Sequence, residues 1–283
     1  MGGIFKSSSR PTYRELAEHW SPFIYQATSG RYDYITRFDF DGNWIGHDNW
    51  ENYECYPLPA YVYYSVIEST NYYFITYLFF HPRDEGNPMC DCSHHENDSE
   101  GCRVTIRKDG SYWGSFYFLE TIAHHDIHSY PQVELVNGSH PAVYVKQKKH
   151  SVYGQNEARQ IQDCYWNPLN PTCRVFPSDT DGTGIGYWNA GRGAEIPESV
   201  NDRDVSYELL SLDEIWQEDL EIPTEIVSGL QLEMITLKMQ QRQGLVLNSL
   251  VIIIRDVVQH LHGLMDSMAL KYFQTGMTGE SGL

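Results

Sequence analysis

The sequence predicts a mainly β protein: a two-sheet antiparallel β-sandwich with long loops, a short N-terminal helix and a long C-terminal amphipathic helix. Residues 60–68 and 71–80 carry β-branched and aromatic side chains on both faces, which is typical of central strands covered on both sides. Clusters of Gly, Asp and Pro separate these runs from further short runs of the same kind. Near the C-terminus the apolar spacing changes to that of an amphipathic helix.

The elements follow from the N-terminus in a definite order. Thr12 with Glu15 three positions later forms a capping box, which predicts a short helix at this point. Strands are then expected at residues 60–68, 71–80, 101–107, 112–121 and 142–146. Two long loops are expected between them, at residues 82–99 and 154–197. Loops of that length in a compact β domain are usually functional or mobile.

A long amphipathic helix is expected from about residue 245 to residue 272. Such a helix packs on the sandwich or on a second copy of the chain, so it is a candidate element for homo-oligomerisation. Insertion into a membrane interface is the alternative, which the scarcity of Lys and Arg on the polar face disfavours. The apolar stripe repeats every seven residues and includes Leu247, Leu250, Ile254, Val257, Leu261, Leu264 and Met268.

These signals divide the chain of 283 residues into four parts. They are a flexible N-terminus at 1–11, the sandwich domain at 12–220, a helical extension at 221–273 and a flexible tail at 274–283. The 38 acidic and 20 basic side chains give a formal net charge of −18. That charge argues against nucleic acid as a partner, and it suits a protein that binds cations.

The termini and cysteines bear on the compartment. The first ten residues contain no apolar stretch of signal-peptide length, and no run of about 18 apolar residues occurs in the chain. We therefore expect no transmembrane span, and either a cytoplasmic location or secretion by a leaderless route. Cys164 and Cys173 bracket a loop with two prolines and are candidates for a disulfide, which would suit an oxidising compartment.

An acidic segment at residues 90–102 is the main candidate site, because it concentrates histidines and carboxylates directly before a strand. If that strand is extended from Asp98, then Asp98 and Glu100 share a face with core residues. Carboxylates on such a face are costly unless they are neutralised. Oxygen ligands favour Ca²⁺ or Mg²⁺, and a contribution from His95 would shift the preference toward Zn²⁺ or Mn²⁺.

Two alternatives remain for this segment. One is a solvated acidic loop in an acidic protein. The other is a thiolate–imidazole zinc cluster, although the single residue between its first two cysteines is not the usual spacing of structural zinc sites. The residues of that cluster would be Cys90, Cys92, His94, His95 and Cys102.

Other segments could complete a cation site. Asp39, Asp41 and Asn43 alternate as at the start of a calcium loop, but Trp50 stands where an EF-hand has Glu. A turn is the equal alternative for that segment. Further candidates are the residues that end or flank strands, namely Asp84, His124, Asp126, His128, His140 and His150.

The spacing His95-x-x-Asp98-x-Glu100 resembles the metal-binding heptapeptide of the necrosis- and ethylene-inducing peptide-like proteins. More broadly, residues 38–44, 81–84, 95–98 and 140–144 look like the related vacuolar-protein-sorting-associated β-sandwich family. The resemblance covers roughly residues 12–216 and leaves out the C-terminal helix. This sequence departs from the heptapeptide in two places, with Asn97 in place of a second His and Ser99 in place of Trp.

The resemblance implies both a site and an activity. The necrosis-inducing proteins are secreted β-sandwich cytolysins that hold a divalent cation in a surface cavity and dock on sphingolipid glycan headgroups. By position, His95, Asp98 and Glu100 would be metal ligands here. The family's additional upstream Asp has two candidate counterparts, Asp84 and Asp91.

Three functions are compatible with these residues. The favoured one is a divalent-cation-binding protein that recognises a polar lipid or glycan headgroup in a toxin-like manner. The second is a metal-dependent hydrolase of phosphoester or ester bonds, with Glu96 or His124 as general base. The third is a structural or assembly role for the heptad helix.

Overall fold

The computed structural model describes residues 10–46, 48–85, 95–123, 126–154, 162–164, 173–175 and 184–215. The expected C-terminal helix with its heptad stripe, the extension at 221–273 and the tail at 274–283 lie outside these residues. They stay predictions, as does the assembly role that depends on them.

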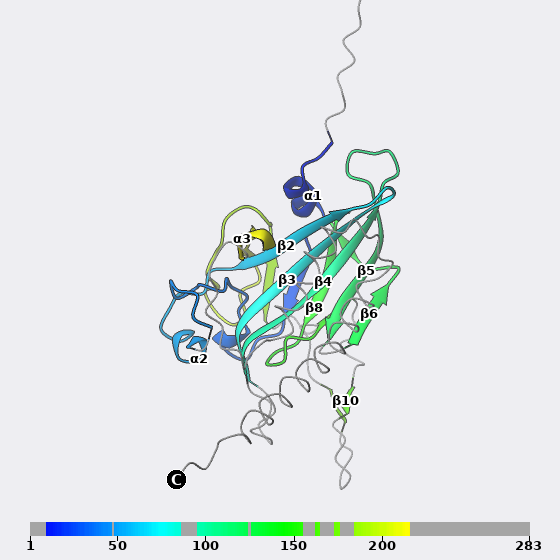
Figure 1. The fold of residues 1–283 in the computed structure, drawn as a ribbon. Coiled ribbons are helices and arrows are strands. Elements are labelled where there is room, and N and C mark those ends of the chain that lie inside the picture. Colours follow the sequence, from blue (N-terminus) through cyan, green and yellow to red (C-terminus); the bar gives the residue numbers. More distant parts are fainter. Residues whose placement is uncertain are drawn as a thin grey trace, which may run out of the picture. The chain divides into compact units, whose positions relative to one another are not determined.

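The larger sheet is built around two long strands, β3 at Tyr72–Asp84 and β4 at His95–Arg107, which pair antiparallel along their whole length. Figure 1 shows this sheet as a twisted layer containing β2, β3, β4 and β5. Its strand order is β14 (Glu208–Ser211), β2 (Tyr61–Glu68), β3, β4, β5 (Ser115–Ala123) and β6 (Asp126–Tyr130).

The second sheet packs against the first, with β9 in contact with β4 and β5. Its β8 lies behind β3 and β4 in the view of Figure 1. The strand order is β13 (Val205–Ser206), β12 (Ile185–Trp188), β1 (Phe23–Gln26), β8 (His140–Val145) and β7 (Leu135–Val136), with β9 (Val152–Tyr153) also paired to β8. A separate hairpin joins β10 (Gln162–Cys164) and β11 (Cys173–Val175).

The expectation of purely antiparallel sheets is wrong, because both sheets are mixed. Strand β1 pairs parallel with β8, β12 pairs parallel with β13, and β14 pairs parallel with β2. Parallel neighbours require long connections between strands that are distant in the sequence. The alternation of apolar and polar residues is the same in either direction, so the local pattern does not reveal which direction a strand takes.

The predicted N-terminal helix is confirmed as α1, at Tyr13–His19. The Thr12 hydroxyl accepts a hydrogen bond from the Glu15 amide at 3.2 Å, and the Glu15 carboxylate accepts one from the Thr12 amide at 2.7 Å. Both bonds of the capping box are therefore present. The other helical segments are short: the 3₁₀ turn η1 at Arg31–Asp33, α2 at Asn49–Asn52 and α3 at Leu212–Ile215.

The long loop expected at residues 82–99 is wrong at both ends, because β3 continues to Asp84 and β4 begins at His95. The loop expected at 154–197 likewise contains β10, β11 and β12. The end of β3 and the start of β4 consist largely of polar residues, so the apolar pattern that predicts strands stops before these strands end. The paired backbone continues into this polar region and brings Asp84 opposite His95.

Strand β3 is covered on both sides only in its second half. From Tyr72 to Tyr77 its residues alternate between half-buried and buried, and from Leu78 to Pro82 all of them are buried. The segment before β2 covers this end, where Thr36 bridges to Phe80 and the Phe38 ring lies 4.2 Å from that of Phe80. The expectation of two-sided burial therefore holds for the half of β3 that leads to the polar strand ends.

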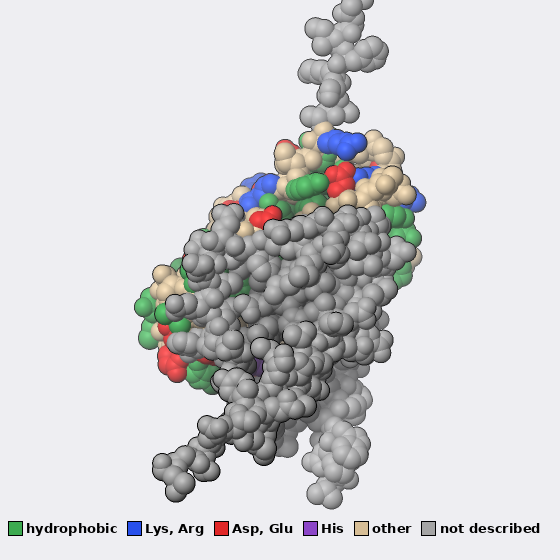
Figure 2. Space-filling view, viewed as in Figure 1, with side chains coloured by type: hydrophobic (Ala, Val, Ile, Leu, Met, Phe, Trp, Pro, Cys, Tyr) green, Lys and Arg blue, Asp and Glu red, His purple; other side chains and the backbone are tan. Residues whose placement is uncertain are grey.

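Basic and acidic side chains occur together on the described surface around α1, as Figure 2 shows at the top of the molecule. Arg14 pairs with Glu18 at 2.6 Å, and both Arg10 and Lys108 pair with Glu68. Near α2, at the lower left of that view, acidic side chains gather among hydrophobic ones. Within the described part of the chain, no helix is both long enough and apolar enough to span a bilayer.

Candidate metal centre

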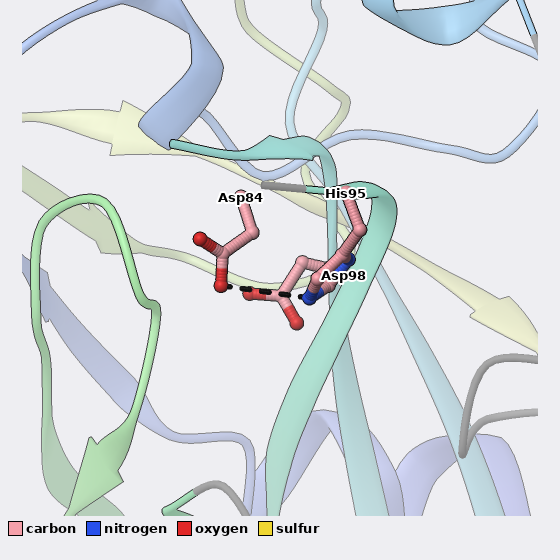
Figure 3. Close-up of side chains that lie close together, drawn as sticks. All are labelled: Asp84, His95 and Asp98. Carbon is pink, nitrogen blue, oxygen red and sulfur yellow. Dashed lines mark ion pairs between the residues drawn. The ribbon is translucent and has the colours of Figure 1, made fainter. Parts of the chain in front are cut away.

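Three side chains with metal-ligating atoms meet where the β3–β4 ladder ends. Asp84, His95 and Asp98 each offer one such atom, and these atoms lie within 4.8 Å of one another. The carboxylates of Asp84 and Asp98 are buried, whereas the His95 side chain is 48% exposed. Figure 3 shows the three side chains turned toward one another, with the ion pair between His95 Nε2 and Asp84 Oδ2 at 3.5 Å drawn as a dashed line.

The backbone of Asn97 makes this convergence possible. Side chains alternate along a regular strand, so His95 and Asp98, three positions apart, would point to opposite faces. Asn97 has a φ of 59°, in the left-handed region that Asn tolerates better than most residues. The resulting irregularity turns His95 to the side of Asp98. The Asn97 side chain is held in turn by the amide of Asn49 at 2.5 Å and by the carbonyl of Gly46.

Helix α2 anchors the start of β4. The Trp50 backbone amide donates a hydrogen bond to Glu96 Oε1 at 2.6 Å. The Trp50 ring lies under the Arg83 guanidinium, with 3.5 Å between the guanidinium carbon and the ring centroid. Glu96, the candidate general base, therefore contacts α2 and does not belong to the group of three. The other candidate base, His124, lies outside the described residues, and the hydrolase stays a prediction.

We expect Asn97→Val to lower the free energy of unfolding by about 2 kcal/mol, because a β-branched residue is disfavoured at positive φ and two hydrogen bonds are lost. Asn97→Gly is the matched control, since it keeps the backbone conformation and removes only the side chain. Its expected loss is about 1 kcal/mol. Urea unfolding of both variants measures the difference, and equal losses would contradict the role given to the left-handed backbone.

A buried histidine supports Asp98 from the second sheet. His150 Nδ1 donates to Asp98 Oδ2 at 2.6 Å, and its Nε2 donates to Asp33 Oδ1 at 3.2 Å. Burial by itself disfavours the charged imidazole, but the hydrogen bonds and charges of Asp33 and Asp98 raise the pKa of His150 to about 9. His150 is therefore an imidazolium that joins two carboxylates at neutral pH.

His81 completes the packing around His150. The two rings stack with 3.7 Å between their centroids, and His81 Nε2 donates to Gln26 Oε1 at 3.2 Å. Burial and the charge of His150 lower the pKa of His81 well below its usual value. The charged imidazole thus lies against a neutral one, which avoids a second buried charge.

Asp33, Lys149 and His81 were not among the candidate residues of the sequence analysis. Lys149 Nζ lies 3.0 Å from Asp84 Oδ1. Asp33 sits in η1, and nothing in its local sequence distinguishes it from other carboxylates. Of the three, only Lys149 could have been suspected from the sequence, because it directly precedes the candidate residue His150.

The remaining candidates divide as follows. Glu100 is buried on the same face as Asp98 but is not in the group of three. Asp39 pairs with Arg37, while Asp41 accepts hydrogen bonds from the side chains of Asn43 and Asn52. Among the described residues, the segment 39–43 therefore forms a turn of its own and does not join Asp84.

The zinc and disulfide expectations fall mostly outside the described residues, which exclude Cys90, Asp91, Cys92 and His94. Cys102 is a buried free thiol opposite Tyr77 in the ladder and is not in the group of three. Cys164 and Cys173 are directly opposite each other in the β10–β11 register, which is a backbone relation only. Asp126 pairs with Ala123 through the backbone of β6. The disulfide stays a prediction.

No protein-family model matches the sequence, and no curated protein matches it. Several solved structures are similar to it, and three of them follow. The non-toxic HaNLP3 protein is 13% identical with a TM-score of 0.36, and the match covers 75% of this chain and 80% of that one. The Necrosis and Ethylene inducing Protein 2 from the causal agent of cocoa's Witches Broom disease is 13% identical with a TM-score of 0.33, covering 68% of this chain and 72% of that one. NLPPya in complex with glucosamine is 17% identical with a TM-score of 0.32, covering 49% of this chain and 64% of that one.

Likeness of this extent assigns no family to the chain. The resemblance to the vacuolar-protein-sorting-associated family finds no support in these comparisons.

Proposed function

We propose that this protein binds a divalent cation through Asp84, His95 and Asp98 and uses it to recognise a polar lipid or glycan headgroup. The observation that carries the proposal is the convergence of two buried carboxylates and one exposed imidazole within 4.8 Å. Such a set suits hard cations, with Ca²⁺ or Mg²⁺ favoured by the oxygen ligands and Zn²⁺ or Mn²⁺ accommodated by the imidazole. Glu100, next along the same face, is proposed as a further ligand on the basis of the sequence resemblance.

The geometry of the strand ends supports this role. Asp84 and Asp98 are 3% and 8% exposed, and their carboxylates lie close enough to one another for a single cation to bind both. His95 is exposed, so the site opens to solvent on one side. A bound divalent cation would supply open coordination positions to the hydroxyl or phosphate oxygens of a headgroup. The residues of the chain hold the ion, while a ligand approaches from the side of His95.

The cation site is tested by calorimetric titration of the full chain, after treatment with chelator, with Ca²⁺, Mg²⁺, Mn²⁺ and Zn²⁺. Binding to the folded state should also raise the melting temperature by mass action. We expect His95→Ala to weaken binding at least about tenfold, because loss of even a residue that only orients a ligand has an effect of that size. His128→Ala, a half-buried histidine of β6, is the matched control and should bind as the wild type does. Unchanged affinity in His95→Ala would remove that residue from the site.

Headgroup recognition is tested separately from cation binding. Vesicles carrying glycosylated sphingolipids and a glycan array are probed with the full chain, with and without divalent cations, and glucosamine serves as a soluble probe. We expect binding that requires the cation and that is lost in His95→Ala. Binding that persists unchanged in chelator would show that the headgroup role does not depend on this site.

A further inference from the structure

The turn between β8 and β9 reaches the proposed cation site with three consecutive residues. Lys148 and His150 have φ values of 70° and 50°, both in the left-handed region that non-glycine residues rarely adopt. A backbone conformation of this kind persists only where its surroundings impose it. Two such residues in one short turn therefore indicate that the turn is held in place by specific contacts.

Those contacts join the turn to Asp33 and to the strand ends that carry the site. The Lys148 amide donates to Asp33 Oδ1 at 2.5 Å, and the Lys148 carbonyl accepts from the Glu85 amide at 3.1 Å. Glu85 directly follows Asp84, so the second bond fixes the turn beside the end of β3. On the other side of the turn, His150 is bonded to Asp98 and Asp33.

The anchored turn directs Lys149 onto Asp84. The Lys149 ammonium lies 3.0 Å from Oδ1 and 3.3 Å from Oδ2 of that carboxylate, and the Lys149 side chain is only 13% exposed. The ammonium thus contacts both oxygens of a carboxylate that belongs to the group of three. A divalent ion coordinated by Asp84 would lie within a few ångströms of this positive charge, in a partly buried region where repulsion is weakly screened.

We propose that Lys149 is an internal counter-cation of the site: its ammonium neutralises Asp84 in the cation-free protein, and a divalent cation binds by displacing it. This inference rests on the proposed function and adds a regulatory residue to it. The lysine sets the cation concentration at which the site of the folded protein is filled, because binding to the folded protein must break the Lys149–Asp84 pair. It also explains how a buried carboxylate is tolerated before the cation arrives.

The test compares the full chain with Lys149→Met and Lys148→Met by calorimetric titration with Ca²⁺ and Mn²⁺. Lys148→Met removes a positive charge from the same turn. Methionine and lysine are equally disfavoured at the positive φ of position 148, so the substitution adds no backbone strain. The contacts described for Lys148 come from its backbone, so this variant reports only the general change in charge. We expect Lys149→Met to bind at least about fivefold more tightly than both other proteins, and its melting temperature to rise more on addition of the cation.

Each result separates the inference from the function on which it rests. If the wild type binds the cation and Lys149→Met binds it no more tightly than Lys148→Met, the counter-cation role is wrong and the cation site stands. If no protein binds any cation, both are wrong. Binding by Lys149→Met alone supports both, with the lysine sealing the wild-type site. If Lys149→Met does not fold without cation, Lys149→Gln replaces it in the comparison of cation affinities. Glutamine keeps a hydrogen-bond donor for Asp84 but carries no charge.

Discussion

Replacement of Asp33 by Ala is expected to lower the free energy of unfolding by about 3–5 kcal/mol, the range found when one partner of a buried charged network is removed. The Asp33 side chain is 0% exposed. Its carboxylate accepts hydrogen bonds from the Ser29 amide at 2.6 Å, the Ser29 hydroxyl at 3.1 Å and the Gly30 amide at 3.2 Å. It also accepts from Lys148 and His150. The substitution removes the acceptor of all these donors, and it leaves the fully buried His150 imidazolium with one carboxylate partner fewer.

Urea unfolding with linear extrapolation measures this loss, provided that the dependence on urea is unchanged. Asp202→Ala is the control, because the partly exposed Asp202 carboxylate accepts from the amides of Glu198 at 2.9 Å and Asp204 at 3.2 Å. Its expected loss is about 1 kcal/mol. A loss in Asp33→Ala no greater than that of the control would show that Asp33 is not a centre of the buried network.

Gly101→Ala is expected to lower the free energy of unfolding by about 3 kcal/mol, at the upper end of the usual cost of overpacking. A Cβ atom on Gly101 would lie 2.2 Å from the backbone carbonyl oxygen of Tyr77 on the paired strand. Backbone cannot rotate away as a long side chain can, so β3 and β4 must separate at this point. The strands carry Asp84 and Asp98 respectively, and we therefore expect cation affinity to fall along with stability.

Gly110→Ala is the control for this second prediction. Gly110 has a φ of +91° and open space around the position of a Cβ, so its substitution carries only the backbone strain of about 1 kcal/mol. It should leave cation affinity unchanged. If Gly101→Ala retains both stability and affinity, the close approach of the two strands at Gly101 does not hold the site together.

Local sequence patterns were sufficient for the elements whose residues interact with near neighbours. The capping box of Thr12 and Glu15 placed α1, and apolar runs placed β2, β3 and most of β5. The same patterns missed the polar ends of β3 and β4, since paired strands continue there without apolar side chains. They also missed the parallel pairs, because strand direction depends on long connections and not on the residues of the strand.

The candidate site was predictable in part. Alternation along an extended strand placed Asp98 and Glu100 on one buried face, and both are buried there. It would have placed His95 on the opposite face, so His95 became a candidate ligand through its place in the acidic segment and through the resemblance to a known motif. The left-handed backbone of Asn97 lets His95 and Asp98 lie on the same side, and residue spacing alone does not predict that conformation. Asp33 and Lys149 were missed because they reach the site from distant parts of the chain through contacts that only the folded sheets create.

The β3–β4 hairpin has a consequence for the order in which the site assembles. Asp84, His95 and Asp98 all lie in this one hairpin, so they can meet as soon as two neighbouring strands pair. His150 is 52 positions away from Asp98 and 117 positions away from Asp33, so the support from the second sheet requires closure of much longer loops. Loop closure of that kind makes distant contacts form slowly. A cation would therefore find its ligands during folding before Lys149 arrives, and the early hairpin would bind it without competition.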